Sequence, residues 1–94
     1  GEPFLQAAAF VVLGRALREK GYNIMTYTGY TYEELQAMAD EETQNLLTVT
    51  DILVDGRFIL AERDLTLPFR GSRNQRIIDL RASRASKTPV EILF

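Results

Sequence analysis

Residues 23–34 read NIMTYTGYTYEE, and this stretch decides the fold class. Its first half, residues 23–28, is rich in β-branched and aromatic residues with apolar character on both faces, which predicts a strand covered on both sides. Thr31 and Glu34 then form a T-x-x-E capping box, so we expect a helix to begin at Thr31. A strand that leads through a short turn into a helix is typical of α/β proteins.

An amphipathic helix is predicted before this stretch, over residues 5–20. Gly21 suits the left-handed conformation that ends many helices. The apolar stripe that we expect to face the core consists of Leu5, Ala9, Val12, Leu13, Ala16 and Leu17.

A further helix and two further strands are predicted after this stretch. The acidic residues 40–42 favour a helix start, because carboxylates are stabilised near helix N-termini, and that helix runs to Leu47. Residues 51–54 predict a second strand, and the imperfect alternation over residues 76–82 predicts a half-exposed strand near a sheet edge. Helices and strands that alternate with short connections predict an α/β fold with partial parallel β/α layers.

The composition indicates one soluble domain over residues 1–94. Hydrophobic residues make up 46% and charged residues 26% of the chain, as in ordinary globular proteins. No apolar stretch is long enough to span a bilayer and no signal peptide is recognisable, so we expect a cytoplasmic protein without membrane contact. Five arginines lie between Arg57 and Arg76, but acidic and apolar residues separate them, and nucleic-acid binding is not expected.

The chain contains no cysteine and no histidine. This excludes disulfides, thiolate-bound clusters and histidine-based metal or acid/base sites within these residues. We therefore assign no catalytic residue and no metal ligand to the chain.

Three glycine-bearing turns occupy the positions where α/β sheets bind ligands, outside the carboxyl ends of strands. Residues 28–30 (Thr-Gly-Tyr) follow the first strand and residues 55–57 (Asp-Gly-Arg) follow the second. Residues 1–3 (Gly-Glu-Pro) precede a helix, so they would follow a further strand. We expect the three turns to face one crevice, although each turn also has a purely structural interpretation.

Several short motifs, in this order and spacing, resemble one family. They are Gly1-Glu2-Pro3-Phe4, residues 18–21 (Arg-Glu-Lys-Gly), residues 27–31 (Tyr-Thr-Gly-Tyr-Thr), residues 51–56 (Asp-Ile-Leu-Val-Asp-Gly) and residues 69–76 (Phe-Arg-Gly-Ser-Arg-Asn-Gln-Arg). The set resembles the family of radical S-adenosylmethionine (SAM) enzymes that activate anaerobic ribonucleotide reductase. The resemblance covers residues 1 to about 81, and residues 82–94 have no counterpart in it.

The resemblance implies an oxidoreductase whose full-length form generates the glycyl radical of its partner, the anaerobic ribonucleotide reductase, by reductive cleavage of SAM. It implies a [4Fe-4S] cluster held by a C-x3-C-x2-C motif upstream, in the full-length protein only. It also implies that the chain is a truncated C-terminal portion of an incomplete TIM-type barrel. The 94 residues alone are then expected to be inactive.

The resemblance also implies site residues. Glu2 matches the glutamate of a Gly-Gly-Glu-Pro motif whose carboxylate and neighbouring backbone meet the amino group of SAM, and Asp55 and Arg57 would stand at its ribose and carboxylate. The cofactor-binding set is Gly1, Glu2, Pro3, Thr28, Asp55 and Arg57. Residues 70–75 form a polar loop that covers the site, contacts the reductase, or is simply solvated.

Two alternatives remain open from the residues alone. The chain can be an inert fragment, or a non-catalytic α/β module for binding or interaction. A chain without strands before Gly1 also leaves the strand at residues 23–28 with an unpaired edge, so a homodimer through this edge is expected.

Overall fold

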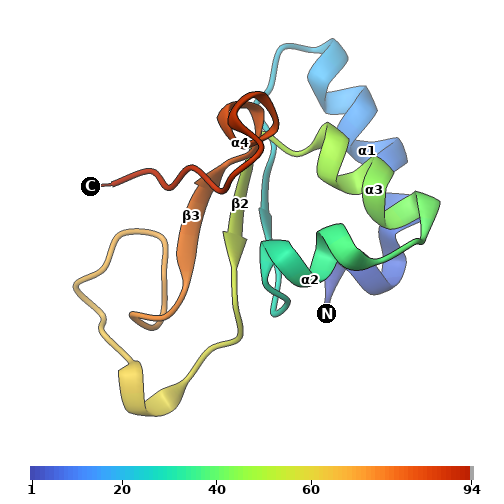
Figure 1. Ribbon diagram of the computed structural model, residues 1–94. Helices are drawn as coiled ribbons and strands as arrows, with labels where there is room; N and C mark the ends of the chain where they lie inside the picture. The colour runs from blue at the N-terminus through green and yellow to red at the C-terminus, as the bar shows by residue number, and fades with distance from the viewer. Residues whose placement is uncertain (94) are drawn as a thin grey trace.

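The computed structural model describes residues 1–93, and its centre is a sheet of three short strands (Figure 1). The strands β1 (Met25–Tyr27), β2 (Ile52–Asp55) and β3 (Arg76–Asp79) lie in the order β1-β2-β3. β1 and β2 are parallel, as predicted, whereas β3 is antiparallel to β2. Phe94 lies outside the described residues.

The antiparallel β3 corrects the expectation of parallel layers throughout. The connection from β2 to β3, residues 56–75, contains the short 3-10 helix η2 (Leu60–Glu62) and no α-helix. A parallel neighbour needs a crossover that carries the chain back along the sheet, usually a helix. This loop returns to the end of β2 that it left, so Asp55 pairs with Arg76 (Figure 1). The fold is therefore α/β with a small mixed sheet.

The helices gather mainly on one side of the sheet (Figure 1). They are η1 (Pro3–Gln6), α1 (Ala7–Glu19), α2 (Tyr32–Ala37), α3 (Glu41–Val49) and α4 (Leu80–Ser86). Across residues 1–93, no helix has the length and apolar character needed to cross a membrane.

Local capping explains where these helices begin and end. The predicted capping box is confirmed, because Thr31 Oγ1 accepts from the Glu34 N–H while the Glu34 carboxylate accepts from the Thr31 N–H. The Asp40 carboxylate accepts from the Thr43 N–H at the start of α3. Gly21 has a φ of 86° directly after α1, as its predicted role requires.

The face of α1 that packs on the core differs from the predicted apolar stripe. Ala7, Val11 and Gly14 are buried, and a Cβ on Gly14 would lie 3.1 Å from Val49 Cγ1 in α3. The helices are therefore so close at Gly14 that a larger residue there would force the Val49 side chain to shift. Of the predicted stripe only Leu17 is half-buried, and the exposed members are Leu5, Ala9, Val12, Leu13 and Ala16.

The strand predicted over residues 76–82 ends at Asp79, where α4 begins. Asp79 is the N-cap of α4, and its Oδ1 accepts from the Ala82 N–H at 3.0 Å. Its carbonyl accepts from Ser83 Oγ at 2.6 Å. Leu80, which the alternation placed in the strand, is buried as the first residue of this helix. The helix cap at Asp79 therefore ends the strand earlier than the alternating apolar pattern of residues 76–82 predicted.

The helix-facing row of the sheet forms the centre of the core. Thr26 on β1, Leu53 on β2 and Ile78 on β3 are paired in register across the sheet. Leu53 and Ile78 are completely buried and pack in one cluster with Leu35 and Leu46 from the helices. This packing holds the carboxyl ends of β1 and β2 together, because it fixes both strands against the same helices.

The two edges of the sheet differ. The C-terminal residues cover the outer edge of β3, where the Asp79 N–H donates to the Val90 carbonyl at 2.9 Å and the Ile92 N–H donates to the Ile77 carbonyl at 2.7 Å. On the other side, β1 has β2 as its only neighbouring strand within residues 1–93. The predicted unpaired edge at residues 23–28 is therefore present.

Candidate functional site

The three predicted turns meet around one hollow of about 350 Å³ at the carboxyl ends of β1 and β2. The residues that line it are Gly1, Glu2, Pro3, Tyr27, Thr28, Gly29, Gly56, Phe58 and Gln75. Its position is the one at which α/β sheets bind ligands, because strand ends there leave backbone groups and turn side chains pointing outward. Of the turns predicted to face one crevice, residues 1–3, 28–30 and 55–57, the hollow is lined by Gly1, Glu2, Pro3, Thr28, Gly29 and Gly56, whereas Tyr30, Asp55 and Arg57 do not line it.

Glu2 is the most strongly held side chain of the hollow. Its Oε1 accepts from the Gly29 N–H at 2.7 Å and from Thr28 Oγ1 at 2.9 Å. Its Oε2 accepts from the Phe4 N–H at 3.1 Å, which caps the helical turn η1. Glu2 therefore joins the start of the first helix to the turn after β1, so two of the three turns share one carboxylate.

Gly56 and Gln75 join the third turn to the others. Gly56 has a φ of 92°, a conformation that favours glycine, and its N–H donates to the Tyr30 carbonyl at 2.7 Å. Gln75 Nε2 donates to the Gly56 carbonyl at 2.9 Å, and its Oε1 accepts from the Gly71 N–H at 2.9 Å. Of the three interpretations of residues 70–75, this contact favours a loop that reaches the hollow.

Asp55 lies behind the hollow and is almost completely buried. Its Oδ2 accepts from Arg76 Nη2 at 2.5 Å and from the Tyr32 N–H at 2.8 Å, and its Oδ1 accepts from Arg76 Nε at 3.1 Å. Arg76 Nη2 also donates to Glu33 Oε1 at 2.5 Å. The hydrogen bonds that Arg76 makes to Asp55 and Glu33 raise the pKa of its guanidinium above its ordinary value. Asp55 does not line the hollow, so its predicted contact with a ligand is replaced here by bonds to β3 and α2.

We expect the Glu33–Arg76 pair to contribute stability that depends on pH. The hydrogen bond from Arg76 lowers the pKa of Glu33 from its ordinary value of 4.5. A carboxylate with a lowered folded-state pKa stabilises the protein above pH 4.5, and this stability is lost as the pH falls through the lowered pKa. Because Glu33 is about half exposed, Glu33→Gln should lower the free energy of unfolding by less than about 1 kcal/mol at pH 7. Urea unfolding at pH 7 and at lower pH checks this, since the difference between the two proteins should shrink as the pH falls through the lowered pKa of Glu33.

The structure separates the other predicted site residues. Thr28 lines the hollow, but its hydroxyl donates to Glu2 and accepts from the Tyr30 N–H at 3.1 Å. The Arg57 side chain is exposed and does not line the hollow. Thr28 therefore helps to build the wall of the hollow, and Arg57 lies outside the lining of the hollow.

Two aromatic side chains of the hollow were missed by sequence reasoning. Tyr27 and Phe58 are 49% and 51% exposed, although both are large and partly apolar. Tyr27 precedes the Thr28 turn and Phe58 follows residues 55–57, so adjacency to the glycine turns was the one signal available. Their exposure beside a polar cradle gives the hollow aromatic walls.

The donor set of the chain does not fit an iron–sulfur cluster. Such clusters select soft thiolate ligands, and the sequence has no cysteine and no histidine. Within residues 1–93, no three acidic side chains gather in a group that could hold a metal ion. No chemical step through a cluster is therefore assigned to the residues of this chain.

The fold is an α/β domain with a hollow, the candidate site, at the carboxyl ends of two parallel strands. Residues 1–78 match the family described as "4Fe-4S single cluster domain", and the chain belongs to this family. The family description names a cluster whose ligands this chain lacks.

Curated relatives are anaerobic ribonucleoside-triphosphate reductase-activating proteins, which confirms the resemblance found in the motifs. The protein from Vibrio cholerae serotype O1 is 41% identical over 79 residues, which cover 80% of this chain and 48% of the relative. The protein from Salmonella typhi is 43% identical over 61 residues, 65% of this chain and 37% of the relative. The chain therefore spans about half the length of these relatives or less. No solved structure gives a significant match to the chain.

Proposed function

We propose that this chain is the SAM-orienting part of a radical SAM activating enzyme, whose full-length form generates the glycyl radical of anaerobic ribonucleotide reductase. The observation that carries the proposal is the hollow in which Glu2 joins the turn after β1 and which Gly56 also lines. The names of the curated relatives support the reductase as the macromolecular partner. The family supports an iron–sulfur cluster in the full-length protein.

Glu2 has the chemistry to receive the amino group of SAM. Three donors, the N–H groups of Phe4 and Gly29 and the hydroxyl of Thr28, already hold its carboxylate in place. An ionised carboxylate offers about four lone-pair positions, so one further donor can bind without displacing the others. An ammonium group that binds there forms a charge-assisted hydrogen bond, which is stronger than a neutral one.

The remaining walls suit the other parts of SAM. Gly29 leaves its backbone open to close approach, because within 4 Å a Cβ added there would meet only the Glu2 carboxylate, at 3.6 Å. Tyr27 and Phe58 present aromatic rings for a flat base. The exposed Arg57 guanidinium is a candidate for the SAM carboxylate, whereas Asp55 acts through Arg76 and α2 as a positioning residue.

In the full-length enzyme, cysteines outside this chain would hold the cluster, and a bound cluster would supply the electron for cleavage of SAM. The residues described above bind and orient the substrate and hold it against the strand ends. We also infer that β1 and β2, the parallel pair, are strands of a partial TIM-type barrel, while the antiparallel β3 lies beyond its parallel part.

Replacement of Glu2 tests the proposal. In the polypeptide encoded by the complete reading frame, we expect Glu2→Gln to weaken SAM binding by about 1–3 kcal/mol, the usual contribution of a hydrogen bond to a charged group. The measurement is calorimetric titration with SAM at constant salt. Unfolding in urea is measured in parallel, because Glu2 also caps η1 and its loss costs stability by itself.

Glu19→Gln is the matched control. It makes the same chemical change at an exposed carboxylate at the end of α1, away from the lining of the hollow. Its affinity for SAM should equal that of the unchanged protein. Equal affinity in the Glu2 variant as well would remove Glu2 from the site, and failure of the unchanged protein to bind SAM would refute the proposed function.

A further inference from the structure

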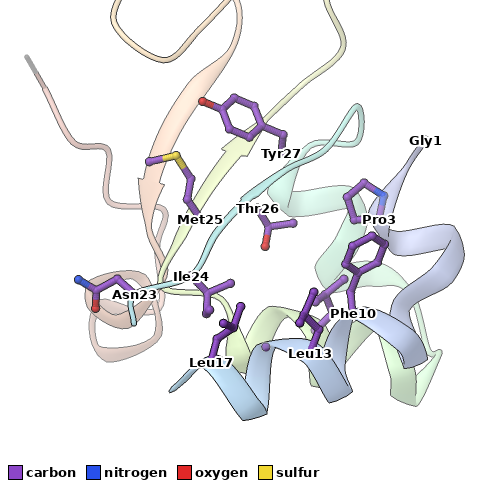
Figure 2. Close-up of a pocket in the computed structure, with 12 residues that line it drawn as sticks. Gly1, Pro3, Phe10, Leu13, Leu17, Asn23, Ile24, Met25, Thr26 and Tyr27 are labelled. Atoms are coloured by element: carbon purple, nitrogen blue, oxygen red, sulfur yellow. The ribbon is translucent and has the colours of Figure 1, made fainter. Parts of the chain in front are cut away.

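The two aromatic residues that line the hollow are held in different ways. Tyr27 stands on β1, and its ring points away from α1 and from the apolar groove of about 460 Å³ between α1 and β1 (Figure 2). Phe58 lies instead in residues 56–75, the long connection between β2 and β3. A sheet fixes its own side chains, whereas a loop residue is fixed only by the bonds of its neighbours. The position of Phe58 therefore depends on what holds the backbone on each side of it.

Two polar side chains hold the backbone on both sides of Phe58. Asn74 Nδ2 donates to the Arg57 carbonyl, in the peptide group before Phe58, at 2.8 Å. Ser72 Oγ accepts from the Ile59 N–H, in the peptide group after Phe58, at 3.2 Å. Ser72 Oγ also donates to Asn74 Oδ1 at 2.6 Å, so the two side chains hold each other. We call Ser72 and Asn74 the clasp.

Gln75 and Gly71 support the clasp on the side of the hollow. Gln75 Oε1 accepts from the N–H groups of Gly71 and Ser72, at 2.9 Å and 3.2 Å, while its Nε2 donates to the Gly56 carbonyl. Gly71 lies against the aromatic ring, because a Cβ added there would be 3.0 Å from Phe58 Cδ2. A side chain at position 71 would therefore push the ring aside.

These bonds are not those of a solvated loop. Ser72 is completely buried although it is polar. The Asp64 N–H donates to the Gly71 carbonyl at 3.1 Å, and the Arg73 N–H donates to the Glu62 carbonyl at 2.9 Å. The loop is thus cross-linked along its length, and its polar motif at residues 70–75 serves to hold the segment that carries Phe58.

We propose that the clasp positions Phe58 as a fixed aromatic wall, and that Phe58 makes the hollow selective for ligands that carry a flat aromatic base. A ring that is already in place loses little entropy when a base stacks on it, so affinity depends on the clasp as well as on the ring. Ser72 and Asn74 are therefore positioning residues, which act through Phe58. The inference rests on the proposed function, because it takes SAM as the ligand.

Three ligands separate the parts of SAM. They are SAM itself, 5′-methylthioadenosine, which keeps the base and the ribose, and S-methylmethionine, which keeps the sulfonium and the amino acid. In the polypeptide from the complete reading frame, Phe58→Leu should weaken binding of the first two by about tenfold, within the range of base–aromatic stacking. Binding of S-methylmethionine should not change. Phe58→Tyr keeps the ring and should retain the affinity for all three, measured by NMR titration, which also follows weak binding.

Asn74→Asp tests the clasp, because it removes the donor to the Arg57 carbonyl and keeps the acceptor for Ser72. It should weaken binding of 5′-methylthioadenosine, which is uncharged, by about threefold. In a protein that already carries Phe58→Leu it should have no further effect, since an effect that passes through the ring disappears with the ring. Asn45→Asp makes the same chemical change on α3, outside the lining of the hollow, and is the matched control.

Gly71→Ala is the second variant, and it removes no hydrogen bond. It should give the same pattern of affinities as Asn74→Asp, because its Cβ displaces the Phe58 ring. A measurement without ligand follows the ring directly. The NMR shift of the Gly71 Hα proton that faces the ring should move toward the value of an unstructured chain in both Phe58→Leu and Asn74→Asp.

Three results would overturn the inference. They are an equal loss of all three ligands in Phe58→Leu, a full effect of Asn74→Asp in the protein without the Phe58 ring, and an unchanged Gly71 Hα shift in Asn74→Asp. The last measurement needs no ligand. A protein that binds no SAM but shows the expected Hα shifts would therefore refute the proposed function, while the positioning of Phe58 by the clasp would stand.

Discussion

Arg76→Leu should lower the free energy of unfolding by about 3 kcal/mol, because it leaves the buried Asp55 carboxylate without its counter-charge. The Asp55 side chain is 1% exposed, and Arg76 binds both of its oxygens. Among residues 1–93, only the Tyr32 N–H would remain as a hydrogen-bond partner of Asp55. Since small domains are stable by about 5–15 kcal/mol, this is a large share of the total. Urea unfolding at pH 7 measures the loss.

Two further variants show whether the buried pair is the cause. Arg76→Lys keeps the charge but cannot form the bidentate fork, so its loss should lie between those of the unchanged protein and Arg76→Leu. The double variant Asp55→Asn with Arg76→Leu removes both charges, and it should be more stable than the sum of the two single losses predicts. Strict additivity would show that Arg76 and Asp55 contribute independently, against the contacts seen here.

The second large effect is chemical, because the 94-residue chain should form no cluster and cleave no SAM. The chain offers no thiolate or imidazole, and its oxygen ligands do not substitute for thiolates at iron–sulfur clusters. After anaerobic reconstitution with iron and sulfide, we expect no cluster absorbance above background. With dithionite and SAM, we expect no 5′-deoxyadenosine, measured by chromatography.

The polypeptide from the complete reading frame is the comparison for this experiment. Treated in the same way, it should show the cluster absorbance and release 5′-deoxyadenosine, because cysteines expected outside the present chain would hold the cluster. Release of 5′-deoxyadenosine by the short chain itself, or an upstream sequence without a cysteine motif, would contradict the radical SAM assignment.

Neighbouring residues explain which parts of the fold were predictable. The Thr31–Glu34 capping box, the Asp40 cap and the left-handed Gly21 each depend on residues no more than a few positions apart, and all three are present. The parallel pairing of β1 and β2 followed from the short helical connection between them. The same reasoning placed the turns at residues 1–3, 28–30 and 55–57 near one another, although only part of each of the last two turns lines the hollow.

The face of α1 and the direction of β3 were not predictable in the same way. Apolar side chains occur on two sides of α1, and periodicity alone does not distinguish the side that meets α3 from the side that borders the groove. The contact of Gly14 with Val49 selects the side with small residues. The direction of β3 depended on residues 56–75 returning without a helix, and loop sequence carries little information about such a path.

The sequence by itself determined the starts of α2 and α3, the glycine turns and the absence of cluster ligands, because these depend on residue type and short spacing. Only the tertiary structure decided that Asp55 is buried behind the hollow rather than exposed to it. Its partner Arg76 lies 21 residues away and Glu33 lies 43 residues from Arg76. An ion pair at such separations leaves no local pattern, because it forms only once packing brings β2, β3 and α2 together.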